Sequence, residues 1–392
     1  MKIKLISAFF VLLMLACNCK TYNIIDDDIK NIEYNTEITP KTFFDISMYI
    51  DTSEFEIIIL ESPEDAIIGQ ITDVYLRDNI IVVVDSRAKC AFSFDRNGNF
   101  INVLGKIGDG PEEYRPFDVN SIIVSENKIG FYDFMKREIK YFDFQNNYIN
   151  TVKNFPISAF KIYPINNEIV CMTEFRVNNN GLNHINVIKE NSKIKSYLPF
   201  DSTMLGMGWG VERTEIQVGD NLYFHVVTKD TIFKYNKETG VTPLYALNIQ
   251  GNYVPEEIKR KTGREALIYS IDNDALLGIN SISVLNDLLL IKLEDKQLVF
   301  DMVMNKNLGV YETFKIQDLG AYASVPINTR GCCIQDGYLI KSMSADDWIN
   351  IREYAPEEYD GQNSSFNKQL WDRTANITEE DNPFLILFKI KE

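Results

Sequence analysis

The chain is poor in the residues on which metal sites and many hydrolases depend. Its 392 residues include 2 histidines, 6 cysteines and 3 tryptophans. No Cys-x-x-Cys, His-Glu-x-x-His or Gly-x-Ser-x-Gly motif occurs in the sequence. Clustered metal ligands and a serine nucleophile therefore lack sequence support. We accordingly expect no catalytic, cofactor-binding or metal-binding residues.

Positive charge is also scarce. The chain has 40 Lys and Arg residues against 56 Asp and Glu residues, a formal net charge of −16. An acidic surface repels nucleic acid and anionic lipid headgroups, so we expect neither as a partner. Beyond residue 16 no hydrophobic run is long enough to span a bilayer.

The N-terminus is the region that predicts export. Lys2 and Lys4 precede an apolar run, and the small residue Ala16 stands directly before Cys17. This is the layout of a secretory signal peptide. The segment Met14-Leu15-Ala16-Cys17 resembles a bacterial lipobox, although that motif more commonly has Leu at its first position and a small residue at its second. An ordinary cleaved signal peptide is the alternative.

If Cys17 is the acylated residue, the lipid chains would anchor the mature protein to the bacterial cell envelope, at the outer membrane or a periplasmic face. Removal of residues 1–16 as a signal peptide would leave 38 basic and 56 acidic residues, a net charge of −18. Residues 17–42 are polar and without a period, which predicts a tether between the lipid and the fold. Cys90 and Cys171 lie in apolar runs and are expected to be buried thiols, with one disulfide among the remaining cysteines as the alternative.

An internal repeat gives the strongest indication of the fold. Residues 85–99 align without a gap with residues 133–147, at an offset of 48 residues. Both copies contain an apolar strand ending in Asp, a polar turn, a strand ending in Phe-Asp, and a second turn. That second turn is Arg96-Asn97-Gly98 in one copy and Gln145-Asn146-Asn147 in the other. Asn and Gly tolerate the left-handed backbone of a tight hairpin.

Four weaker copies follow, near residues 168–189, 222–240, 288–305 and 332–343. A repeat of this length with about four strands suits a propeller blade, which cannot bury both of its faces alone. The sequence therefore predicts an all-β fold in which residues 43–392 form a six-bladed β-propeller. The strands expected at 55–60 and 384–390 would pair and close the ring.

Two stretches interrupt the repeat. Residues 254–278 begin with Pro255 and acidic residues, and residues 344–382 contain Trp348, Trp371 and many acids. Both are predicted to be partly helical insertions. Insertions in repeat proteins usually emerge on one face, which is often the binding face.

The chain resembles the six-bladed propeller lipoproteins of gut-type bacteria, which are similar to NHL-repeat propellers. The resemblance is dense in residues 57–145 and rests on motifs such as Phe94-Asp95-Arg96-Asn97-Gly98 and the stretch from Gly105 to Tyr114. It continues to the closing segment Asp381-Asn382-Pro383-Phe384-Leu385. The resemblance implies the fold and almost nothing about activity, because propellers support many functions.

Three local motifs are expected to be structural. The Gly105–Tyr114 stretch lacks the Lys-Ser/Thr of a phosphate loop and suits a connection between blades. The Asp95–Asn99 stretch lacks the bidentate Glu of a calcium loop and suits a hairpin turn. The run of glycines at 206–210 has no strand–helix unit around it, so a dinucleotide site is not expected there.

The candidate ligand contacts are cationic or aromatic residues in loops. An arginine can hold a carboxylate or sulfate through two hydrogen bonds, and a tryptophan face stacks on sugars or apolar rings. Salt bridges between blades, solvated positions and packing roles are the alternatives. The candidates are Arg115, Arg176, Trp209, Arg213 and Arg330.

These features predict a non-enzymatic binding or protein-interaction module on a cell-envelope lipoprotein, with a glycan fragment, peptide or protein as ligand. The alternative is a propeller hydrolase or lyase that acts on extracellular sugars or lactones, with or without a divalent metal. A purely structural assembly subunit is a third interpretation.

Overall fold

A computed structural model describes most of the chain. The described residues are 30–35, 50–64, 66–77, 79–85, 87–116, 119–177, 180–189, 193–206, 215–226, 229–285, 288–294, 299–305, 310–315, 332–335, 337–354 and 364–391. Cys17 and most of the predicted tether lie outside these ranges. Within them the chain is dominated by short antiparallel strands, as the composition predicts.

The strands form one five-stranded and five four-stranded sheets among the described residues. The first sheet contains β3 (Asp73–Arg77), β4 (Ile80–Asp85), β5 (Cys90–Asp95) and β6 (Phe100–Leu104). The second contains β7 (Val119–Val124), β8 (Ile129–Asp133), β9 (Glu138–Phe142) and β10 (Tyr148–Val152). The third contains β11 (Lys161–Ile165), β12 (Glu168–Met172), β13 (Asn183–Ile188) and β14 (Ile194–Pro199).

Two of the other three sheets include a strand from the N-terminal part of the chain. The fourth contains β15 (Glu215–Val218), β16 (Asn221–His225), β17 (Thr231–Asn236), β18 (Gly240–Gln250) and β1 (Lys30–Asn35). The fifth contains β19 (Gly278–Leu285), β20 (Leu288–Glu294), β21 (Val299–Asn305) and β22 (Val310–Lys315). The sixth contains β23 (Cys332–Gln335), β24 (Tyr338–Met343), β25 (Phe384–Ile390) and β2 (Ile50–Ile59).

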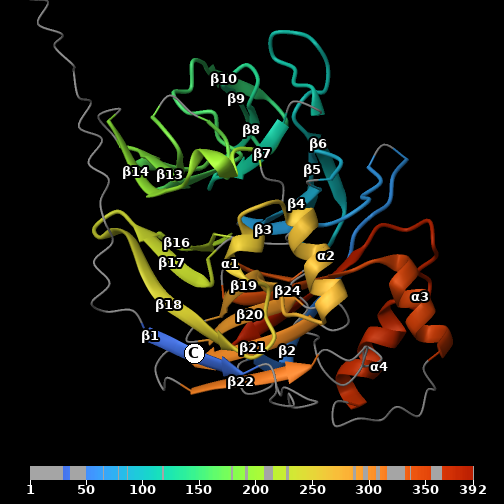
Figure 1. Cartoon of the computed structure of the whole chain (residues 1–392). Helices are drawn as coiled ribbons and strands as arrows, with labels where there is room; N and C mark the ends of the chain where they lie inside the picture. The colour runs from blue at the N-terminus through green and yellow to red at the C-terminus, as the bar shows by residue number, and fades with distance from the viewer. Residues whose placement is uncertain are drawn as a thin grey trace, which may run out of the picture.

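The sheets follow one another around a common centre (Figure 1). In each sheet the strands lie in the order of the chain, apart from β1 and β2, which join late sheets from the N-terminus. The first strands of neighbouring sheets contact one another, including β7 with β11, β15 with β19, and β23 with β3. The fold is therefore an all-β propeller, and we call β3, β7, β11, β15, β19 and β23 the inner strands.

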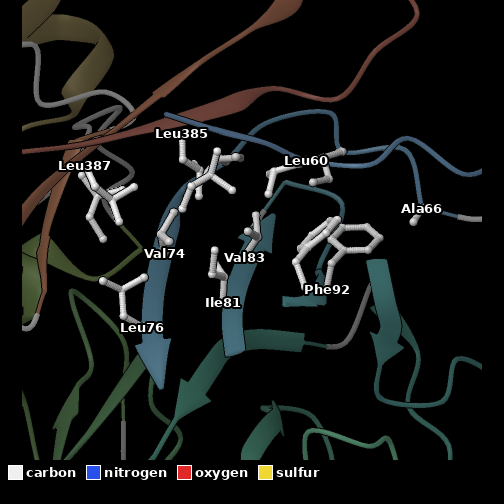
Figure 2. Close-up of a cluster of buried hydrophobic side chains, with 14 of the residues drawn as sticks. Leu60, Ala66, Val74, Leu76, Ile81, Val83, Phe92, Leu385 and Leu387 are labelled. Carbon is white, nitrogen blue, oxygen red and sulfur yellow. The ribbon is translucent and has the colours of Figure 1, made fainter. Parts of the chain in front are cut away.

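The two ends of the chain meet in the sixth sheet. Strand β2 pairs antiparallel with β25, from Ile50 opposite Ile390 to Ile59 opposite Phe384. Figure 2 shows how Leu385 and Leu387 of this sheet pack against Val74 of the first sheet. Apolar side chains thus fill the contact between the last sheet and the first.

Asn382 connects the same two regions through hydrogen bonds. Its buried amide accepts from the Ile68 backbone N–H at 2.7 Å and donates to the carbonyl oxygens of Glu61 and Ala66 at 2.9 and 2.8 Å. The segment that follows β2 is therefore fixed to Asn382, two residues before β25.

Residues 30–35 differ from the sequence-based expectation of a tether. They form β1, which adds to the outer edge of the fourth sheet in parallel with β18. Ile32 is buried, and the Glu33 carboxylate accepts from the side-chain amides of Asn248 and Gln250. The partner strand β18 is more than two hundred residues away in the sequence, so no local sequence pattern predicts β1.

The repeated hairpin turn has the same hydrogen bonds in both copies. The Asp95 carboxylate accepts from the Asn99 side-chain amide at 2.7 Å and from two backbone N–H groups. The Asp143 carboxylate accepts from the Asn147 side-chain amide at 2.9 Å and from two backbone N–H groups. Asp95–Asn99 is therefore a hairpin turn whose carboxylate is occupied by the turn itself, as predicted.

Helices occur within both stretches that interrupt the repeat. Helices α1 (Glu256–Lys259) and α2 (Gly263–Asn273) lie between β18 and β19, and α3 (Ala345–Tyr354) and α4 (Ser364–Arg373) between β24 and β25. Thr262 caps α2 by accepting from the Glu265 N–H at 3.1 Å, a standard start signal. Within the described ranges, every helix is too short or too polar to cross a bilayer.

The side chains of two cysteines lie within the described part of the chain. Cys90 and Cys171 are buried free thiols, as expected. Burial and the nearby Asp85 carboxylate raise the pKa of Cys90 to about 12. Both thiols are therefore unreactive residues of the hydrophobic core.

Candidate functional site

Charged residues begin three of the inner strands. Asp73 is the first residue of β3, Lys161 of β11 and Glu215 of β15. Because the inner strands occupy the same position in their sheets, these residues meet at one end of the propeller's centre. We call Asp73, Lys161, Tyr163, Glu174 and Glu215 the axial cluster.

A buried carboxylate with two donors forms the core of the axial cluster. Lys161 Nζ forms an ion pair with Glu215 Oε1, and the Tyr163 hydroxyl donates to the same oxygen at 2.7 Å. The Glu215 side chain is 2% exposed, whereas that of Lys161 is 32% exposed. A buried charge is tolerated only when it is paired, and here the third sheet supplies both donors to the fourth. The Lys161 side chain of the pair therefore remains partly accessible.

Tyr163 stays protonated in this environment. Burial raises its pKa well above the ordinary value, and the Glu215 carboxylate and its hydrogen bond raise it further. Asp73 and Tyr75 on β3 act in the same direction, so β3 lies within electrostatic reach of β11. Tyr163 is thus a hydrogen-bond donor and is unsuited to act as a base.

Glu174 completes the axial cluster from the turn between β12 and β13. Its φ of 49° is left-handed, which is unfavourable for a residue with a side chain and is found at sites that hold a side chain in a particular place. Burial raises the pKa of Glu174, while the charges of Lys161 and Arg176 oppose that shift. Three carboxyl groups and one ammonium group therefore converge here from the first, third and fourth sheets.

The predicted site residues fall in different places. Arg176 is half-buried, and its guanidinium lies 5.1 Å from the ring centroid of Phe160 and 5.5 Å from that of Phe134. It packs between the second and third sheets and borders the axial cluster. Arg115 is exposed and forms an ion pair with Asp109 in its own connection. Trp209, Arg213 and Arg330 lie outside the described residues.

The connection that includes Gly105 and Tyr114 links the first two sheets, as predicted. The Gly105 N–H donates to Asn146 Oδ1 at 2.7 Å, and the Gly110 N–H donates to Glu113 Oε2 at 2.8 Å. Amides of this connection are therefore engaged by the protein's own oxygens. That arrangement suits a junction and not an anion loop.

His184 is enclosed by aromatic rings. Its ring centroid lies 4.9 Å from that of Phe175 and 4.8 Å from that of Phe200. Burial, with a smaller contribution from Lys229, lowers the pKa of His184 to about 3. The imidazole is therefore neutral at physiological pH and is part of the core. Among the described residues, no group of three or more His, Cys, Asp or Glu side chains is arranged to hold a metal ion.

The sequence analysis missed every residue of the axial cluster. A charged residue at the first position of an otherwise apolar inner strand is the signal that could have identified Asp73, Lys161 and Glu215. This signal becomes readable only after the inner strands have been assigned, and the predicted strands near 168–173 and 222–227 are the second strands of their sheets.

Comparison with solved structures supports the propeller fold. A Bacteroides fragilis protein that is thought to be exported shares 15% identity at a TM-score of 0.69, over 93% of this chain and 100% of that one. A DUF4221 family member from Bacteroides vulgatus shares 9% identity at a TM-score of 0.50, over 87% and 99% of the two chains. At these identities the similarity shows the fold alone.

A virginiamycin B lyase from Staphylococcus aureus also matches, with 11% identity and a TM-score of 0.36, over 73% of this chain and 94% of the lyase. This similarity is too weak to support a functional argument. No curated protein matches the chain. One family model does match, from residue 26 to residue 389, and the chain therefore belongs to the family described as a domain of unknown function, DUF4934.

Proposed function

We propose that the chain is a lipid-anchored binding module of the bacterial cell envelope whose ligand contacts the axial cluster. The proposal includes a ring of six blades similar to NHL-repeat propellers, closed by the pairing of β2 with β25. Six sheets in chain order and the register of that pair support the ring. The signal-like N-terminus with Cys17 supports the proposed location in the cell envelope. The fold shared with a Bacteroides fragilis protein thought to be exported agrees with that location.

The ion pair between the partly exposed Lys161 and the buried Glu215 carries the binding proposal. Burying the Glu215 carboxylate costs free energy that a well-packed apolar residue would not incur, so the fold alone gives no reason to place a charge there. The cluster lies where inner strands of several sheets begin, and the Lys161 side chain remains partly exposed. A binding site needs this combination of a fixed geometry and an exposed polar edge.

A non-enzymatic role agrees with the protonation states. Tyr163 is held protonated and His184 is neutral and enclosed, so neither is poised to exchange a proton near neutral pH. A glycan fragment or a peptide suits the site, because both present hydroxyl or amide groups to carboxylates and lysines. Arg115, Arg176, Trp209, Arg213 and Arg330 remain candidate contacts, of which Arg176 borders the cluster.

The binding proposal is tested by screening the full chain, purified in mild detergent, against glycan fragments and peptides. For a ligand found in the screen, Glu215→Gln should weaken binding about tenfold or more, because a charged hydrogen-bonding group contributes on the order of 1.5–3 kcal/mol. Lys161→Gln should have a similar effect. Glu238→Gln, on an exposed turn of the fourth sheet, is the matched control and should leave the affinity unchanged.

Melting temperatures and circular dichroism identify variants that are unfolded, and the Lys161→Gln variant gives a second measurement if Glu215→Gln is unstable. Unchanged affinity in two folded cluster variants would contradict the site. The anchor is tested separately with Cys17→Ser, which should move the protein from the membrane fraction to the soluble fraction of the envelope. Retention of that variant in the membrane would contradict lipid attachment at Cys17.

A further inference from the structure

Helix α2 buries its small side chains and exposes its large ones. Ala266 and Ser270 are buried, whereas Leu267, Ile268 and Ile271 are 42%, 46% and 48% exposed. A surface helix normally turns its apolar stripe towards the core. The three exposed residues are neighbours on one side of the helix, because residues three and four positions apart lie on the same face. We call them the apolar face of α2.

The opposite side of α2 is already occupied by the insertion to which the helix belongs. Ala266 packs with Val254 and Ala275 in a small buried cluster. The Ser270 hydroxyl donates to the Ala275 carbonyl oxygen. Turning the apolar face inward would break these contacts and would force larger side chains into a space that is filled by small ones. The exposure of the apolar face is therefore fixed by the packing of the insertion.

The insertion is also fixed to the propeller. Helix α1, which contacts α2 (Figure 1), contributes Lys259, whose side chain is 1% exposed. Lys259 Nζ lies 3.0 Å from Asp230 Oδ2, directly before β17 of the fourth sheet, and 4.5 Å from the ring centroid of Tyr253. Removing one partner of so deeply buried an ion pair is costly. Helix α2 therefore presents its apolar face from a defined position.

Two charges of α2 are placed against the helix dipole. Arg264 lies in the first turn and Asp272 in the last, whereas a helix favours acids at its N-terminus and bases at its C-terminus. Glu265 is the acid that follows the usual preference. Arg264 and Asp272 are exposed, and neither side chain forms a hydrogen bond or an ion pair with another described residue. The helix alone therefore gains nothing from these two charges.

The same two charges match across an antiparallel pair of α2 helices. Arg264 lies four positions before Ile268, and Asp272 lies four positions after it. If two copies of α2 cross antiparallel at Ile268 about a twofold axis, Arg264 of each copy lies opposite Asp272 of the other. The two apolar faces then meet between the two ion pairs. The antiparallel arrangement also places the positive end of each helix dipole beside the negative end of the other.

We infer that two copies of this chain associate through α2, with their apolar faces in contact and Arg264 of each copy paired with Asp272 of the other. A contiguous exposed apolar patch marks an interaction site, and the symmetric placement of the two charges selects a second copy as the partner. Two short helices bury a small interface, below about 1,200 Å² in total, so the dimer should be weak and dependent on concentration. This inference goes beyond the proposed function and does not rest on it.

The first test measures self-association of the full chain in mild detergent. Sedimentation at chain concentrations from about 1 µM to about 1 mM, where weak complexes dissociate, should show a mass that rises towards two chains. Ile268→Glu should weaken association at least tenfold, because two carboxylates then meet at the twofold axis. Ile149→Glu, at a residue of β10 that is 47% exposed, is the matched control and should leave association within twofold of the unsubstituted chain. Melting temperatures confirm that both variants are folded.

The second test uses the charge pairs to identify the partner and the register. Arg264→Asp and Asp272→Arg, made separately, each place like charges opposite one another at both ends of the helix pair. Each should weaken self-association about tenfold or more. The double variant reverses both members of each pair, so its association should return to within about threefold of the unsubstituted chain. An equimolar mixture of the two single variants should form mixed dimers, because each variant then supplies the charge that the other lacks.

The inference is overturned if the chain has the mass of one copy throughout this range, if Ile268→Glu and Ile149→Glu associate alike, or if neither the double variant nor the mixture recovers association. Two chains that merely share a detergent micelle would be unaffected by the residue at position 268. A chain that does not self-associate but binds phosphatidylcholine vesicles through Ile268 would also overturn the inference and assign the apolar face to a lipid surface.

Discussion

The first and second sheets use the same position of the repeat to dock on the sheet before them, but in different ways. Gly98 and Asn146 are equivalent residues of the two hairpin turns, with φ values of 88° and 66°. Gly98 lies against the backbone of β2, where an added Cβ would come within 2.0 Å of the Ile59 carbonyl oxygen. Asn146 instead accepts a hydrogen bond from Gly105 at the end of β6.

The difference follows from the preceding strand. At the first sheet that strand is β2, which comes from the N-terminus and approaches the turn so closely that Glu61 N–H donates to the Gly98 carbonyl at 2.9 Å. At the second sheet it is β6, which leaves room for a side chain. The repeat therefore preserves the backbone of the turn, and each junction selects the side chain that fits it.

The largest expected effect is at Gly98. Gly98→Ala places a Cβ against the Ile59 carbonyl in a left-handed conformation, so we expect a loss of about 3–5 kcal/mol in the free energy of unfolding. Gly219→Ala is the control, because its φ of 55° is also left-handed but nothing lies within 4 Å of the added Cβ. That control should lose only about 1–2 kcal/mol. Urea unfolding measures both, and equal losses would show that close approach is irrelevant at the junction.

A smaller effect is expected at Asn146. Asn146→Gly retains the left-handed backbone but leaves the part-buried Gly105 N–H without its acceptor, which should cost about 1–2 kcal/mol. Asn166→Gly, at an exposed residue with a φ of 53°, tests the backbone change alone and should be neutral or slightly stabilising. Urea unfolding of the two variants gives the contrast. A neutral Asn146→Gly would mean that this hydrogen bond does not hold the junction.

The smallest effect is expected where the two turns are alike. The hydrogen bond from the Asn99 side chain is the main cause of the lowered pKa of Asp95. For Asp143, slight burial opposes the shift, but the hydrogen bonds from Asn147 and Gln145 still lower the pKa. A carboxyl group whose pKa is lower in the folded than in the unfolded state stabilises the protein at pH values above the unfolded-state pKa. That stabilisation is lost as the pH falls through the folded-state pKa. Asp95→Asn and Asp143→Asn should therefore each lower the melting temperature slightly, and by the same amount, at pH 7.

These differences from the unsubstituted chain should begin to shrink as the pH falls below the unfolded-state pKa of about 3.8, because the unfolded carboxylate is then protonated and the stabilisation is lost as the pH falls through the lower folded-state pKa. Melting curves of the three proteins across this range provide the measurement. Unequal shifts for the two variants at pH 7 would show that the neighbouring sheet, and not the turn, determines the contribution of the carboxylate.

Local patterns explain what could be predicted from the sequence. The Phe-Asp strand ends and the Asn- and Gly-containing turns encode hairpins within a few residues, so the repeat at 85–99 and 133–147 was readable without tertiary information. The same holds for α2, where Thr262 and Glu265 form a start signal inside a stretch that interrupts the repeat.

The features that the sequence did not predict depend on contacts between segments that are distant in the chain. Strand β1 forms because β18 offers an edge, and the polar sequence of residues 30–35 does not indicate that partner. The axial cluster depends on which strand of each sheet is innermost, and the period of the repeat leaves that undetermined. Arg176 was selected for its charge, but whether it packs or binds depends on Phe134 and Phe160 in neighbouring sheets.

The pairing of β2 with β25 also imposes an order of events on biosynthesis. The sixth sheet needs a strand from near the start of the chain and another that ends two residues before its last residue. During synthesis the early segment therefore waits, with its edge unsatisfied, until β25 has been translated, which takes roughly 15–70 s at about 5–20 residues per second. Exposed strand edges invite aggregation during such a delay. Chaperones that hold emerging chains are thus expected to act on strand β2, and a nascent chain that terminates before β25 would leave β2 permanently without its partner.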